Sequence, residues 1–120
     1  MHYVTGIGGF FFRANDPEGL AKWYLEHLGV SLVPADYSIQ PWQQKAGPTV
    51  FAPFPRDNEH FGDLNKSWML NFRVSNLDAI VALLRQRGID VTVDPATYPN
   101  GRFARLRDSE GNPLELWQPL

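Results

Sequence analysis

The chain has 120 residues, of which 43% are hydrophobic, and its formal net charge is −2. This length suits a single domain that buries a core of its own. With no cysteine, disulfide scaffolds, thiolate metal sites and cysteine nucleophiles are excluded, and a cytoplasmic protein is favoured. No basic stripe and no apolar run of ~20 residues stand out, so we expect neither a nucleic-acid partner nor a membrane partner.

The first half predicts a strand, a helix and three further strands. An apolar run at 10–13 is followed by Asp16 and Pro17, a typical helix start, and Gly29 is a typical helix stop. Between them the apolar positions recur with helical spacing, and they are Leu20, Trp23, Tyr24, His27 and Leu28. Strands are then expected at 30–33, 37–43 and 49–54.

The second half has the same plan. A strand is expected at 70–74 and a helix at 77–87, which begins with a capping box of Ser75 and Asp78 and stops at Gly88. The helix has one apolar stripe, formed by Leu77, Ile80, Val81 and Leu84. The β-branched run 89–93 predicts another strand.

The chain closes with a predicted β-hairpin, whose strands at 101–108 and 113–118 flank a polar turn that contains Gly111. Alternation places Leu114 and Leu116 on one face of the sheet and Glu115 and Trp117 on the other. If the leucines pack on a helix, Glu115 points to the opposite face. A carboxylate in such a place needs a partner, because burying a lone charge is costly.

Together these elements predict an α+β fold of two βαβββ modules. The halves span about 5–54 and 67–118, are joined by the polar loop 55–66, and form one domain over 1–120. A shift of 60 residues aligns Phe12 with Phe72 and Arg13 with Arg73. Each helix covers one face of its sheet, so the other faces curve around a shared cavity.

The chain resembles the vicinal oxygen chelate superfamily, which includes glyoxalase I, bleomycin-resistance proteins and extradiol dioxygenases. The resemblance covers nearly the whole chain and rests on three motifs: Phe12-Arg13-x-x-Asp16 followed by Trp23-Tyr24 and Leu28-Gly29, then Phe72-Arg73-Val74, and finally Asp108-x-Glu110-Gly111-Asn112-Pro113-Leu114-Glu115-Leu116. Ser109 departs from the usual proline. The resemblance implies the glyoxalase/bleomycin-resistance/dioxygenase fold and a homodimer.

In metal-dependent members of this superfamily, His, Gln and Glu side chains at four positions hold a divalent ion. The corresponding residues here are Gly9, Phe51, Met69 and Glu115. Only Glu115 is a ligand for the hard ions that the family uses, so we predict no metal and no other cofactor. His60, in the linker, is the one histidine that could swing over the cavity, although a solvated loop histidine is the simpler interpretation.

The remaining inward residues predict a small-molecule site of aromatic walls and a few polar groups. Glu115 is the candidate catalytic residue, and Arg105 on the neighbouring strand is its expected partner; a pair that merely neutralises an inward glutamate is an equally good interpretation. The predicted ligand-binding residues are Phe11, Met69, Asn71, Phe103, Arg105 and Trp117. Arg13 and Arg73, at equivalent strand ends, are expected to hold loop carbonyls or nearby acidic residues.

Two functions of different classes follow. The first is a metal-free protein that binds a small, partly aromatic or cationic molecule in a cup with Glu115 and Arg105, as the drug-sequestering members of the superfamily do. The second is a glyoxalase-like lyase or isomerase with an altered or absent metal site, in which Glu115 acts as general base. The sequence does not name the ligand.

Overall fold

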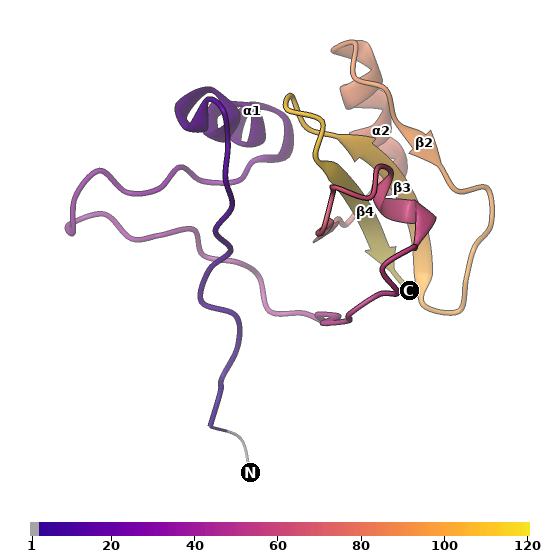
Figure 1. Ribbon diagram of the computed structural model, residues 1–120, viewed down its shortest axis with the longest axis horizontal. Helices are drawn as coiled ribbons and strands as arrows, with labels where there is room; N and C mark the ends of the chain where they lie inside the picture. Colours follow the sequence, from indigo (N-terminus) through magenta and orange to yellow (C-terminus); the bar gives the residue numbers. More distant parts are fainter. Residues whose placement is uncertain (1–2) are drawn as a thin grey trace.

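The structure is a computed structural model that describes residues 3–120. In chain order its elements are α1 (Pro17–Leu28), the short 3₁₀ helix η1 (Glu59–Phe61), β1 (Leu70–Arg73), α2 (Leu77–Gln86), β2 (Thr92–Val93), β3 (Gly101–Arg107) and β4 (Pro113–Pro119). Figure 1 shows one open sheet with α2 behind it and α1 beside one end. In the described residues no helix is long and apolar enough to cross a membrane.

The second half forms the predicted βαβββ module. Its four strands lie in the order β1-β4-β3-β2. β1 runs parallel to β4, whereas β3 is antiparallel to both β4 and β2. The α+β class expected from the sequence is therefore confirmed, and the sheet is mixed.

The helix ends follow the local sequence closely. Asp16 caps α1 by accepting a hydrogen bond from the backbone N–H of Gly19, with Pro17 directly after it, and Gly29 ends the helix with φ of 70°. The predicted capping box of α2 is wrong in its first residue. Asn76, rather than Ser75, accepts from the N–H of Ala79, because a side-chain amide at the residue just before the helix reaches that N–H equally well.

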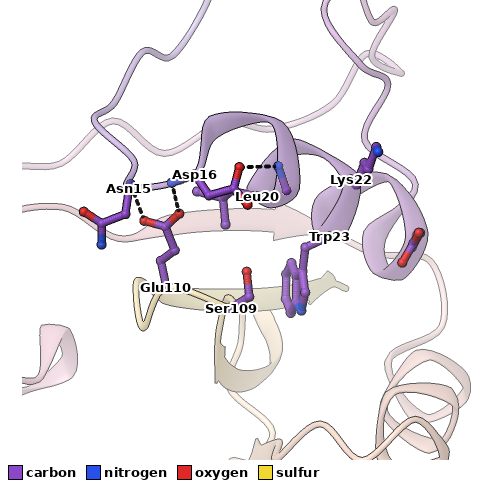
Figure 2. Close-up of a pocket in the computed structure, with 9 residues that line it drawn as sticks. Asn15, Asp16, Leu20, Lys22, Trp23, Ser109 and Glu110 are labelled. Atoms are coloured by element: carbon purple, nitrogen blue, oxygen red, sulfur yellow. Dashed lines mark hydrogen bonds between the residues drawn. The ribbon is translucent and has the colours of Figure 1, made fainter.

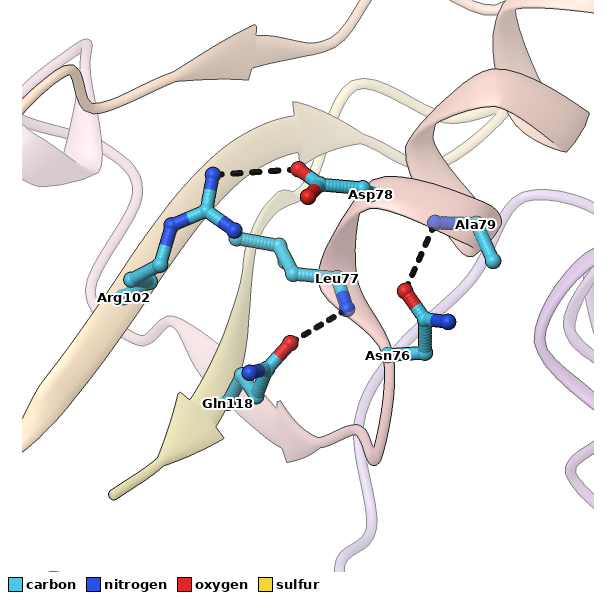
Figure 3. A network of polar contacts seen from close by, with 6 residues as sticks. All are labelled: Asn76, Leu77, Asp78, Ala79, Arg102 and Gln118. Carbon is cyan, nitrogen blue, oxygen red and sulfur yellow. Dashed lines mark hydrogen bonds and ion pairs between the residues drawn. The ribbon is translucent and has the colours of Figure 1, made fainter.

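The N-terminus of α2 is also held by the hairpin (Figure 3). The Gln118 side-chain oxygen accepts from the backbone N–H of Leu77 at 2.7 Å, and Arg102 pairs with Asp78 at 3.0 Å. One free N–H of the first helical turn is thus satisfied by β4, which fixes where the helix sits on the sheet.

The core lies between the helices and one face of the sheet. Leu77 and Leu84 of α2 and Leu114 and Leu116 of β4 are fully buried. Leu20 and Tyr24 of α1 belong to the same cluster. The prediction that Leu114 and Leu116 pack against a helix is confirmed, and both helices share one core.

The first half does not form its predicted strands. The segments 10–13, 30–33, 37–43 and 49–54 contain no strand, and Figure 1 shows them as long irregular stretches outside the sheet. Alternation marks a strand, but it does not supply the hydrogen-bonding neighbour that a strand requires. Proline also interrupts the run 30–54 at Pro34, Pro41, Pro48 and Pro53, and each removes a ladder donor.

A buried polar cluster joins α1 to the turn between β3 and β4. Asp108 is 5% exposed and accepts hydrogen bonds from the Tyr24 hydroxyl, from the backbone N–H groups of Glu110 and Asn112, and from the Asn112 side chain. These four donors satisfy the buried carboxylate without a cation beside it.

This cluster makes stability sensitive to high pH through Tyr24. Burial first, and then the hydrogen bond to Asp108 and the charge of that carboxylate, raises the pKa of Tyr24 far above its ordinary value of 10.0. Above pH 10.0 the Tyr24 hydroxyl ionises in the unfolded chain but stays protonated in the folded one. The free energy of unfolding therefore falls as pH rises through this range. We expect Tyr24→Phe to reduce this alkaline decline in urea titrations, whereas the same change at the exposed Tyr37 leaves it unaltered. An unchanged decline in Tyr24→Phe would contradict the assignment.

Candidate functional site

The face of the sheet opposite the helices, here called the inner face, carries the predicted polar and aromatic residues. Alternation along each strand and the register between strands determine its members. Asn71 lies beside Glu115 and Arg73 beside Trp117 across β1 and β4. Arg105 lies opposite Glu115, and Phe103 opposite Trp117, across β3 and β4. Five predicted site residues thus share one surface with Arg73: Asn71, Phe103, Arg105, Glu115 and Trp117.

A polar row crosses the inner face at the level of Glu115. Its Oε1 accepts a hydrogen bond from the Asn71 side chain at 2.8 Å, and its Oε2 lies 3.2 Å from Arg105 Nη2. The Glu115 side chain is 12% exposed and that of Arg105 is 36% exposed. The predicted partner of the buried carboxylate is therefore present, together with a second donor from β1.

Aromatic rings lie next to this row. Phe103 and Trp117 are parallel to within 4°, with ring centroids 6.2 Å apart, and Tyr98 meets Phe103 edge-on at 5.9 Å. The Trp117 indole N–H donates to the carbonyl of Asn100 at 2.8 Å. The close approach requires Gly101, whose φ is 135° and whose added Cβ would lie 2.8 Å from the indole nitrogen.

The loop before β3 borders the aromatic rings. Asp94 accepts hydrogen bonds from the N–H of Ala96 and from the Tyr98 hydroxyl. The hydrogen bond from Ala96, followed by that from Tyr98, lowers the pKa of Asp94, and the charges of Arg105 and His60 act in the same direction. The hydrogen bond between Tyr98 and Asp94 raises the pKa of Tyr98, so this phenol stays protonated as a donor.

Three other predicted residues, Phe11, His60 and Met69, lie outside the strands of the inner face. Phe11 is 94% exposed, so it lies in solvent instead of on the sheet. Met69 is half-buried immediately before β1, in phase with Asn71, and His60 lies in η1. Arg73 holds a loop, as expected: its guanidinium donates to the carbonyls of Lys45 and Pro48 and to the Thr49 hydroxyl.

The residues at the family's metal positions do not fit a divalent ion. Gly9 has no ligand atom, the Met69 thioether is soft, and the Glu115 carboxylate already faces a guanidinium cation and an amide donor. Within residues 3–120 no group of three or more His, Asp or Glu side chains lies close enough to hold a metal.

One groove was not foreseen from the sequence (Figure 2). It lies between the start of α1 and the β3–β4 turn, has a volume of about 440 Å³, and is lined by residues that include Trp23, Lys22 and Ser109. At its edge the Glu110 carboxylate accepts from the N–H groups of Asn15 and Asp16 at 2.8 and 3.0 Å. These partners are 94 and 95 positions away along the chain, so no local pattern could identify them.

The comparisons with known proteins agree with the fold. No curated protein matches the chain. Among solved structures, TnmS3, an antibiotic binding protein from Streptomyces sp. CB03234, is 24% identical with full coverage of both chains and a TM-score of 0.68. A glyoxalase/bleomycin resistance protein from the same organism is 26% identical, with 87% of this chain and 92% of that chain covered and a TM-score of 0.55.

A third structure, virulence protein STM3117 from Salmonella typhimurium, is 20% identical, with 93% of this chain and 100% of that chain covered and a TM-score of 0.57. The glyoxalase-like domain family matches residues 9–117. This range is nearly the whole chain and includes Asn71, Phe103, Arg105, Glu115 and Trp117. The protein is therefore a member of the glyoxalase-like domain family, consistent with the vicinal oxygen chelate superfamily.

Proposed function

We propose that the protein binds a small, partly aromatic molecule on the inner face, without a metal or other cofactor. The observation that carries the proposal is the polar row of Asn71, Glu115 and Arg105 beside the parallel rings of Phe103 and Trp117. Aromatic surface with a few placed polar groups is what small-molecule sites require. The likeness to an antibiotic binding protein and to a bleomycin resistance protein supports the same class of function.

The enzymatic alternative, a glyoxalase-like lyase or isomerase, needs Glu115 as a free general base. Both carboxylate oxygens already have a partner, one in Asn71 and one in Arg105, and a base must reach the proton that it removes. Binding without turnover is therefore the better interpretation. The cytoplasmic location and the absence of a nucleic-acid partner stay predictions from composition.

The site is tested by NMR titration of the ¹⁵N-labelled protein with flat aromatic fragments. Two indole N–H signals serve as internal reporters, because Trp117 lies on the inner face whereas Trp23 lines the groove beside α1. We expect the signals of Trp117, Asn71 and the backbone of β3 to shift. Shifts confined to Trp23 and its neighbours would overturn the placement of the site, and native mass spectrometry of the purified protein checks for a ligand that co-purifies.

Glu115→Gln separates a binding role from a structural one. The Arg105 side chain is 36% exposed, so water screens its charge when the carboxylate is removed, and we expect a loss of only about 1 kcal/mol in the free energy of unfolding. Fragment affinity should change by roughly threefold or more, because the position of Arg105 depends on this pair. Unchanged affinity with a large loss of stability would assign Glu115 to structure alone, and turnover abolished at intact affinity would favour the enzyme.

We also propose that the protein is a homodimer in which a second copy covers the open first half. Apolar side chains of that half are strongly exposed, among them Phe11 at 94%, Val33 at 88% and Phe51 at 86%. The radius of gyration is 15.3 Å, whereas a compact chain of this length has about 14 Å. Exposed apolar segments of this extent mark an interaction surface, and a symmetric pair is the commonest assembly.

Sedimentation equilibrium tests the dimer. At about 50 micromolar we expect a mass of twice the 13.6 kDa chain. Phe51→Glu should shift the equilibrium to monomer, because it places a charge in the buried contact. Leu64→Glu is the matched control, since Leu64 is also exposed but lies in the linker between the halves. A wild-type protein that sediments as a single chain would contradict the proposal.

A further inference from the structure

The acidic group of the inner face is already satisfied. Each oxygen of Glu115 has a partner, Asn71 at 2.8 Å and Arg105 at 3.2 Å, and the side chain is 12% exposed. A cationic ligand would have to displace one of these partners and would meet the charge of Arg105 beside it. The carboxylate therefore offers little to a cation, although an acidic group in an aromatic cup first suggests one.

The inner face has unused hydrogen-bond donors, and they belong to Arg105. A guanidinium has five N–H groups, and within residues 3–120 its single close polar partner is Glu115, through Nη2. Its Nε is buried and has no hydrogen-bond partner in the described part of the chain. Because the side chain is 36% exposed, a small molecule can reach part of it.

A second cation adds to this surplus. Arg73, on the same face of β1, donates to two backbone carbonyls and one hydroxyl, all of which are neutral. Asp94, the other acid near Arg105, already accepts from Ala96 and Tyr98. The face therefore has more unmatched positive charge and donors than unmatched acceptors.

The donors of Arg105 lie next to the aromatic surface. Arg105 and Phe103 are two residues apart on β3, so they point the same way, and Phe103 is parallel to Trp117 within 4°. Resting on the proposed binding function, we infer that the inner face selects flat aromatic molecules that carry an anionic or hydrogen-bond-accepting oxygen, and that Arg105 binds that oxygen. Arginine suits this role because its planar fork matches carboxylate and similar oxygens.

Two naphthalene probes that differ only in charge test the inference: naphthoate and naphthylmethylammonium. We expect naphthoate to bind at least roughly tenfold more tightly by calorimetry, which is the scale of one charge-assisted hydrogen bond, and to shift the Trp117 indole signal. Arg105→Met should abolish this preference. Arg102→Met is the matched control, because Arg102 lies on the same strand as Arg105 but pairs with Asp78 on α2.

If circular dichroism shows that Arg105→Met is unfolded, Arg105→Lys is used in its place. It keeps the charge but loses the planar fork, so naphthoate affinity should fall while the preference over the amine persists. Equal or tighter binding of the amine, or unchanged naphthoate affinity in a folded Arg105 variant, would overturn the inference and leave the binding function standing. If neither probe moves the Trp117 signal, the proposed site and the inference both fail.

Discussion

Asp108→Ala is expected to lower the free energy of unfolding by about 3 kcal/mol or more, since it deletes the acceptor of four hydrogen bonds in a buried place. Asp108 is 5% exposed, and its donors come from Tyr24 of α1 as well as from Glu110 and Asn112 of its own turn. Without the carboxylate these donors are left unpaired away from water. Urea denaturation followed by far-ultraviolet circular dichroism measures the loss.

Asp78→Ala is the control for that change. Asp78 also pairs with a donor, Arg102 at 3.0 Å, but its side chain is 77% exposed, so water screens the pair and we expect a much smaller loss than in Asp108→Ala. Comparable losses in the two variants would show that the Asp108 cluster does not hold α1 on the hairpin. The comparison also measures how far stability depends on the contacts of Asp108, which connect the first half of the chain to the second.

The contacts between α1 and the β3–β4 hairpin illustrate which parts of the fold can be predicted from the sequence. The start and stop of α1 at Asp16 and Gly29 are local signals, and the structure confirms both. The alternation of β4, with Leu116 facing the helices and Glu115 on the inner face, is also local. By contrast, Glu110 binds the N–H groups before α1 from 94 and 95 positions away, and only the folded topology brings those groups together.

The candidate site divides in the same way. The pairing of Arg105 with Glu115 follows from hairpin register, which a short turn determines, and the structure places them opposite each other. The hydrogen bond from Asn71 depends on β1 lying parallel to β4 after a helical crossover, which periodicity does not specify. The strands of the first half could not be assigned correctly, because pairing depends on a neighbour and not on alternation alone.

The aromatic part of the inner face depends on one residue, Trp117. It is 7% exposed, it is parallel to Phe103, and its indole N–H closes the loop at Asn100. These contacts serve stability and the proposed binding at once, because the ring fills space against β3 and forms part of the aromatic wall next to Arg105. A truncation of Trp117 should therefore change both the free energy of unfolding and the ligand affinity.

Trp117→Ala is expected to lower the free energy of unfolding by about 3 to 5 kcal/mol, the usual cost of removing a buried large aromatic side chain, and to abolish naphthoate binding. Trp42→Ala is the matched control, since Trp42 is 39% exposed, and it should cost less than about 1 kcal/mol. Trp117→Phe keeps a ring but loses the hydrogen bond to Asn100, so it should fold well enough for titration and bind more weakly. Full affinity in Trp117→Phe together with a loop that is unchanged by NMR would show that the indole has no part in recognition, and a small loss in Trp117→Ala would contradict its place in the packed sheet.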